Sequence, residues 1–233
     1  MITSKYCYLR ENCKKKFDGT TCKDEDMFCL KLFKVDTLYN STLLTDKQRV
    51  RILLYPDQDG TDLDSFKILK SIEEHIVPFV RNGKNLFIHS AFTGNGKTSW
   101  AIRMIQSYVL SVWAEYNVDD CPALFINVPR FLLSLKDSIS NQSDYIDHVK
   151  KHILDADLVV WDEVGVKTLS EYDHENLLNL INTRLDEGKS NIYTSNLTAP
   201  DLKEKVGNRL FSRIVKLSTD IELFGTDKRT LYK

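Results

Sequence analysis

The chain has 233 residues, of which 42% are hydrophobic and 28% charged, and its formal net charge is −1. This length suits one substantial α/β domain with a small additional part, and the near-zero charge argues against a general polycation, so any contact with nucleic acid must come from a local basic patch. No apolar run of about 18 residues occurs and the first residues lack the apolar stretch of a secretory signal, so we expect a cytoplasmic protein without a membrane segment.

Cysteines are concentrated at the start of the chain. Four of the five lie within the first 29 residues, between polar spacers that cannot build a core: Cys7, Cys13, Cys22 and Cys29. Because cytoplasmic thiols stay reduced, four thiolates around one Zn²⁺ would stabilise so short a segment. The spacing lacks a tight C-x2-C pair, so a flexible tail with incidental cysteines stays as the alternative. We predict a zinc-binding module in residues 1–35, and expect Cys121 to be a core residue.

A helix and then a β-α alternation follow. Residues 36–84 are predicted to be a linker and a helix, since turn formers in "PDQDGTD" precede apolar residues at helical spacing. In residues 85–233, short apolar runs alternate with helical segments, at 85–90, 123–128, 156–163, 190–195 and 214–224. This alternation predicts an α/β fold with a mostly parallel sheet covered by helices on both faces.

The stretch "IHSAFTGNGKTSW" (88–100) nearly matches the phosphate-binding pattern G-x-x-x-x-G-K-[ST] between a strand and a helix. Its glycines would let backbone N–H groups point at phosphates, Lys97 would reach the β- and γ-phosphates, and Thr98 would place a hydroxyl for Mg²⁺. Ala91 replaces the first glycine, at little cost if its φ is negative. The predicted ATP-binding residues of this loop are Ala91, Gly94, Asn95, Gly96, Lys97, Thr98 and Ser99.

Two acids end the predicted strand in "DLVVWDEVG". The carboxyl ends of parallel strands meet at one edge of a sheet, so Asp162 would hold Mg²⁺ together with Thr98, and Glu163 would orient the attacking water. Two solvated acids would be the simpler interpretation without the loop. Asn196, after the strand "NIYTS", is predicted to hydrogen-bond the γ-phosphate or that water.

Basic residues near the end of the chain are further candidates. Arg209 and Arg213 are four apart and share one face of a helix. An arginine there is a phosphate clamp within the chain, an arginine finger for a neighbouring subunit, or part of an exposed basic face. Arg229, in "LFGTDKRT", could fold back on the phosphates.

In this order, the motifs resemble those of the DnaC/DnaI group of AAA+ replicative-helicase loaders, in the IstB-like ATP-binding superfamily. The resemblance covers residues 85–230, including a helical insertion at 129–155, and implies a P-loop AAA+ (ASCE) fold. The implied roles are Walker A for Lys97 and Thr98, Walker B for Asp162 and Glu163, sensor 1 for Asn196, arginine finger for Arg213 and sensor 2 for Arg229.

The resemblance implies an ATP- and Mg²⁺-dependent ATPase that loads a hexameric replicative DNA helicase onto single-stranded DNA, in a bacterium or a phage-infected bacterium. Copies of the chain would associate through the arginine finger, and the zinc module would contact the helicase. The insertion offers basic and aromatic groups for DNA: Arg130, Lys136, Lys150, Lys151, Phe131 and Tyr145. Phe131, Leu132 and Leu135 equally suit a helix that packs its apolar face inward.

Three other functions stay open. The first is an IstB-like transposition ATPase that binds DNA and recruits a transposase. The second is a nucleotide or small-molecule kinase, which the sequence disfavours because no arginine-bearing lid segment is evident. The third is a zinc adaptor without catalysis, which the complete set of Lys97, Thr98, Asp162 and Glu163 argues against.

Overall fold

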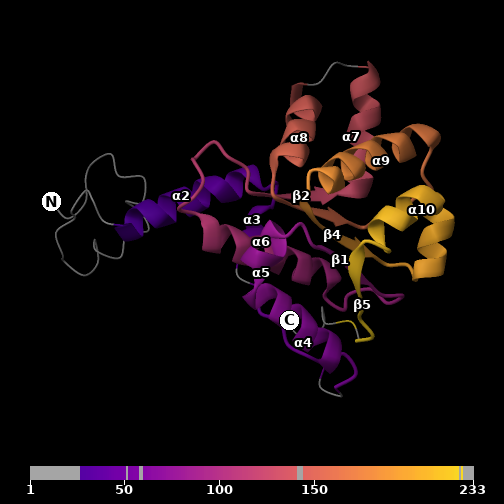
Figure 1. Cartoon of the computed structure of the whole chain (residues 1–233), viewed down its shortest axis with the longest axis horizontal. Coiled ribbons are helices and arrows are strands. Elements are labelled where there is room, and N and C mark those ends of the chain that lie inside the picture. The colour runs from indigo at the N-terminus through magenta and orange to yellow at the C-terminus, as the bar shows by residue number, and fades with distance from the viewer. Residues whose placement is uncertain (1–26, 51, 58–59, 141–143, 226, 228–233) are drawn as a thin grey trace.

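The computed structural model describes residues 27–50, 52–57, 60–140, 144–225 and 227. In this part of the chain, a five-stranded sheet lies between two groups of helices (Figure 1). The strands are β1 (Asn85–His89), β2 (Ala123–Asn127), β3 (Leu158–Asp162), β4 (Ser190–Ser195) and β5 (Ser218–Glu222). Every neighbouring pair is parallel, in the order β2-β3-β4-β1-β5. The predicted parallel α/β sheet is therefore confirmed, and its fifth strand is shorter than predicted because a helix continues through residue 214.

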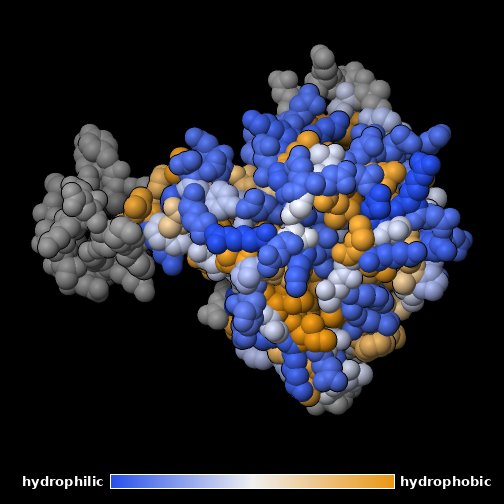
Figure 2. Space-filling model, in the orientation of Figure 1, coloured by the Kyte–Doolittle hydropathy of each residue, from blue (hydrophilic) through white to orange (hydrophobic). Residues whose placement is uncertain are grey.

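Helices cover both faces of the sheet (Figure 1). Their bounds are α2 (Met27–Ser41), α3 (Asp46–Arg49), α4 (Leu63–Glu74), α5 (Ile76–Arg81), α6 (Lys97–Val112), α7 (Val128–Ser140), α8 (Asp144–Asp155), α9 (Glu171–Asp186) and α10 (Ala199–Ile214). None of the helices in the described ranges is long and apolar enough to cross a membrane. Hydrophilic residues cover most of the face shown in Figure 2, with an apolar area in its lower centre.

Successive side chains along each strand point to opposite faces of the sheet, so the core forms two layers, one on each face. Leu86 and Ile88 of β1 pack with α4, α5 and α6, whereas Phe87 between them packs with α7 to α10. The same alternation occurs in β3, where Val160 and Trp161 belong to opposite layers. Because both faces are covered, β1, β2 and β3 are mostly apolar, as expected for a buried parallel sheet, whereas the edge strand β5 is mostly polar and partly exposed.

Residues 36–84 belong to the first of these layers, although the sequence suggested a linker and a helix. Six buried side chains from this segment lie in the same apolar cluster as Leu86: Leu38, Leu44, Leu69, Ile76, Phe79 and Val80. The segment therefore contributes to the core of the α/β domain. Cys121 is buried in the second layer, so its predicted core position is confirmed.

Helix α10 has a break that bears on its arginines. Thr198 accepts a hydrogen bond from the backbone N–H of Asp201 and caps the start of the helix, next to Pro200. Gly207 has φ 78° and ψ 164°, a conformation outside the helical region that suits glycine. The last turns, which carry Arg213, therefore follow a direction different from that of the first turns.

Arg184 of α9 joins three elements from within the core. Its side chain is fully buried, at 0% exposure, and burial lowers the pKa of the guanidinium to about 10. Its five hydrogen bonds go to the backbone oxygens of Ile153, Ala156, Asp157 and Ser190 and to Oδ1 of Asn191. One side chain thus satisfies carbonyls at the end of α8 and at the starts of β3 and β4.

Replacing Arg184 by methionine is expected to lower the free energy of unfolding by about 3 kcal/mol or more, since buried acceptors would lose their donor. Urea denaturation followed by circular dichroism measures this loss. The exposed Arg130, changed in the same way, is the control and should have an effect within about 0.5 kcal/mol. A loss below about 1 kcal/mol for Arg184→Met would show that water replaces the guanidinium.

Candidate nucleotide-binding site

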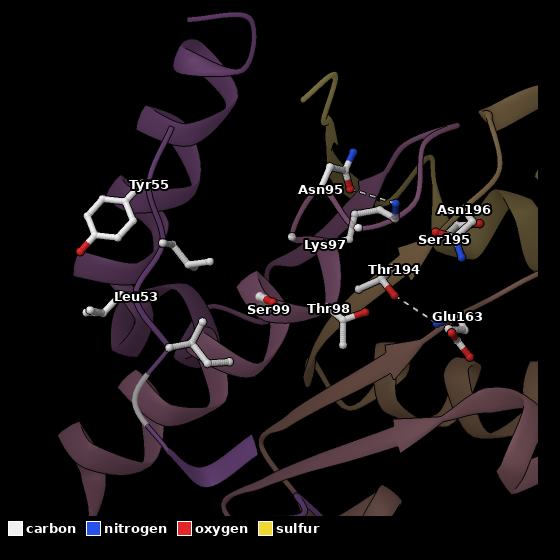
Figure 3. A pocket seen from close by; sticks show the side chains of 14 residues that line it. Leu53, Tyr55, Asn95, Lys97, Thr98, Ser99, Glu163, Thr194, Ser195 and Asn196 are labelled. Atoms are coloured by element: carbon white, nitrogen blue, oxygen red, sulfur yellow. Dashed lines mark hydrogen bonds between the residues drawn. The ribbon is translucent and has the colours of Figure 1, made fainter. Parts of the chain in front are cut away.

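A cleft of about 500 Å³ lies at the carboxyl ends of β1, β3 and β4 (Figure 3). Four segments line it: the strap Ile52–Tyr55, the loop Gly94–Ser99, Glu163, and Thr194–Asn196. In the strap, Ile52 and Leu54 pack against the core and give the cleft an apolar wall. The cleft thus combines an apolar side with a polar floor.

The loop between β1 and α6 has the backbone geometry of an anion site. Gly94 and Gly96 have φ of 78° and 102°, which side chains other than glycine rarely adopt. Helix α6 begins at Lys97, so the N–H groups of its first turn point toward the loop. Ala91 is not among the positive-φ residues, and the alanine therefore fits there without strain. It lies outside the residues that line the cleft.

Lys97 is held inside this loop. Its Nζ donates to the backbone oxygen of Phe92 at 2.6 Å and to Asn95 Oδ1 at 3.1 Å, and the residue is 6% exposed. The amide of Asn95 donates in turn to Ser90 Oγ at 2.6 Å and to the backbone oxygen of Leu223 at 3.1 Å. Asn95 therefore fixes the lysine and ties the loop to the chain just after β5.

Thr98 and Asp162 meet at the base of the cleft. Thr98 Oγ1 donates to Asp162 Oδ1 at 2.8 Å, and Thr194 Oγ1 donates to the same oxygen at 2.7 Å. Burial raises the pKa of Asp162, and these two hydrogen bonds counteract only part of that rise. A hydroxyl beside a carboxylate is a donor set that suits Mg²⁺, and a cation would offset the cost of burying the charge. The pair therefore fits Mg²⁺.

Glu163 follows with a strained backbone. Its φ is 62°, in the left-handed region that costs a residue other than glycine about 1–3 kcal/mol. Its N–H donates to Thr194 Oγ1 at 3.0 Å, and its Oε2 accepts from Asn127 Nδ2 at 3.0 Å. Oδ1 of Asn127 accepts the backbone N–H of Arg130 at 3.2 Å, so one amide joins the start of α7 to the Glu163 carboxylate.

The roles of Asn127 and Thr194 were not predicted from the sequence. Asn127 ends β2 and is paired with Asp162 in the sheet, so a polar residue at the end of a neighbouring strand was the available signal. Asn196, which was predicted, lines the cleft beside the buried Ser195 (Figure 3).

A sequence model of the family described as "IstB-like ATP binding protein" matches residues 38–216. The chain belongs to this family. The matched range begins well before residue 85, in agreement with the packing of residues 36–84 into the same core as the strands. No curated protein sequence matches the chain.

Solved structures share the fold of this IstB-like chain. The DnaC helicase loader is 19% identical, with a TM-score of 0.57, over 80% of this chain and 98% of that one. DnaI is 18% identical, with a TM-score of 0.59, over 78% and 95%. AMPPCP-bound DnaA from Aquifex aeolicus is 17% identical, with a TM-score of 0.56, over 81% and 54%. The described sheet and helices therefore form an AAA+-like, IstB-like ATP-binding domain.

Arg213 lies away from the cleft of its own IstB-like domain. It is exposed at the end of α10, where its Nε donates to Asn182 Oδ1 at 2.7 Å. With Arg209 it lines a separate hollow between α9 and α10. This position does not match a phosphate clamp within the same chain. Arg229 lies outside the described residues.

The predicted zinc ligands are mostly outside the described residues as well. Cys7, Cys13 and Cys22 precede residue 27, and Cys29 is a half-buried residue of α2. Within the described ranges of the IstB-like chain, no group of three or more His, Cys, Asp or Glu side chains could hold a metal ion.

The predicted insertion forms α7 and α8. Phe131 is 6% exposed and packs in the core with Leu132 and Leu135, so the inward-packing alternative is the one observed, and Phe131 does not offer its ring to a base. Lys136 forms an ion pair with Asp173 at 2.7 Å. Among the proposed DNA contacts, the exposed ones are Arg130, Lys136, Tyr145 and Lys151.

Proposed function

We propose that this IstB-like chain is an ATPase that loads a hexameric replicative DNA helicase onto single-stranded DNA. The observation that carries the proposal is the meeting of Lys97, Thr98, Asp162 and Glu163 at one cleft of an ATP-binding domain. The likeness to the DnaC helicase loader, over 98% of that chain, supports the choice of partner.

Each group has a task that its position supports. The loop N–H groups and Lys97 bind the triphosphate, and the strap provides an apolar wall for the base. Thr98 and Asp162 hold Mg²⁺, which when bound neutralises charge on the phosphates. Glu163 orients the attacking water and accepts its proton, while Asn196 donates to the γ-phosphate or that water. In this proposal residues 1–35, with Zn²⁺ on their cysteines, contact the helicase.

Arg213 acts on the nucleotide of a second copy of the chain, since it is exposed and lines a separate hollow rather than its own cleft. Changing Arg213 to alanine is expected to leave ATP affinity within about twofold of the parent and to lower hydrolysis stimulated by DNA or by the partner at least about tenfold. Steady-state phosphate release measures the rate, and titration of a fluorescent ATP analogue measures the affinity. Parental stimulated hydrolysis would exclude the finger role.

A transposition ATPase that recruits a transposase is the second candidate, and the family description favours it. Co-purification of the full chain with the replicative helicase of the source organism, with and without ATP, separates the two. A stable helicase complex that depends on ATP supports the loader. Absence of a helicase complex, together with an ATP-dependent complex with a transposase, would replace the loader by the second candidate.

A further inference from the structure

The side chain of Arg213 is tied to the neighbouring helix. Its Nε donates to Oδ1 of Asn182, which is a half-buried residue of α9, at 2.7 Å. Both side chains line a hollow of about 460 Å³ between α9 and α10, together with Arg209. An exposed arginine without such a contact samples many rotamers, so the bond to Asn182 restricts where the guanidinium lies.

The choice of Nε as the atom that Asn182 binds determines which N–H groups of the Arg213 guanidinium stay available for a phosphate. A guanidinium has five N–H donors in one plane, and it binds phosphate best through two parallel hydrogen bonds. When Asn182 accepts the Nε–H, the edge formed by Nη1 and Nη2 is the one that can grip a phosphate in this way. The contact therefore positions the arginine without using the edge needed for the ligand.

The backbone beneath this pair is also fixed. The break at Gly207 separates the last turns of α10 from the first ones. Leu210 and Ile214 of these last turns are fully buried against the second core layer. Arg213 thus extends from a well-packed turn, and Asn182 constrains the part of the side chain that packing does not reach.

We propose that Asn182 is a positioning residue for Arg213, and that it holds the guanidinium ready for the triphosphate bound to a second copy of this chain. The inference rests on the finger role given above to Arg213. Asn182 itself touches no nucleotide. Its effect on catalysis passes through Arg213 alone.

A double-mutant cycle tests this inference in the full-length chain. Asn182→Ala is expected to lower the stimulated kcat about tenfold, the equivalent of about 1.4 kcal/mol, with KM for ATP unchanged. Asn182→Asp keeps an acceptor oxygen at the same place and should retain activity within about threefold of the parent. In the Arg213→Ala background, Asn182→Ala should have no further effect. Asn179→Ala, an exposed asparagine one turn earlier on α9, is the matched control and should equal the parent.

The outcomes separate this inference from the proposed function. An equal loss of rate from Asn182→Ala in the parent and in the Arg213→Ala background would overturn the inference, because Asn182 would then act independently of the arginine. Parental activity of Asn182→Ala, with Arg213→Ala inactive, would overturn the inference but leave the finger role intact. Parental activity of Arg213→Ala would overturn both.

Discussion

Changing Lys97 to alanine should weaken ATP binding about 100-fold or more, which is the scale expected when one partner of a buried charge pair is removed. The ammonium is almost fully buried in the loop and is held by Phe92 and Asn95. A triphosphate bound at the loop would lose the loop's cation, and the backbone N–H groups of the loop and the proposed Mg²⁺ would have to compensate its charge. Titration of a fluorescent ATP analogue measures the dissociation constant.

Two further variants make this result specific to the site. Lys203→Ala, at an exposed position of α10, has the same chemical change and should bind the analogue like the parent. Lys97→Met keeps most of the buried aliphatic chain and should lose affinity as Lys97→Ala does, which separates loss of charge from loss of packing. Undiminished binding by both Lys97 variants would remove this lysine from the nucleotide site.

Glutamine at position 163 should lower ATP hydrolysis about 100-fold or more while ATP still binds, since general-base catalysis contributes about 10²–10⁴-fold. Glutamine has nearly the same shape as glutamate, and its oxygen can still accept from Asn127 Nδ2. The strained backbone at φ 62° is retained too, because Thr194 still accepts the N–H. What the variant lacks is the negative charge that orients the water and takes its proton. Phosphate release under single-turnover conditions isolates this step.

The control for this experiment is Glu175→Gln on the exposed face of α9, which should hydrolyse ATP at the parental rate. ATP affinity of Glu163→Gln, measured with the same fluorescent analogue, should stay within about threefold of the parent, because the phosphate contacts of Lys97 and the loop are kept. Hydrolysis by Glu163→Gln within threefold of the parent would assign the base to another residue.

Much of the sheet could be predicted because its signal is local. The strands β1, β2 and β3 are short, mostly apolar runs, which are recognisable without knowledge of the fold. The phosphate loop could be placed for the same reason, since Gly94 to Thr98 are consecutive. The N-terminal helices were harder to assign: the turn formers before Leu63 resemble those of a linker, whereas the packing of Leu38 and Leu44 depends on contacts with strands more than 40 residues away.

The sequence also did not predict side chains whose roles depend on contacts with residues far away in the chain. Asn127 is one polar residue after an apolar run, and its contact with Glu163 exists only because β2 and β3 are neighbours in the sheet. Thr194 is a common strand residue until the fold places it between Asp162 and the Glu163 backbone. Likewise, no sequence pattern links Arg213 to Asn182, which is 31 positions away on another helix.

The amide of Asn95 has a consequence for biosynthesis. It bonds the backbone oxygen of Leu223, 128 positions later in the chain, and the N–H of the same leucine bonds the His89 oxygen before the loop. A nascent polypeptide that stops short of β5 has the whole glycine-rich stretch but lacks the support that closes it. The loop is therefore expected to close for ATP only after Leu223 has been synthesised and β5 has paired with β1.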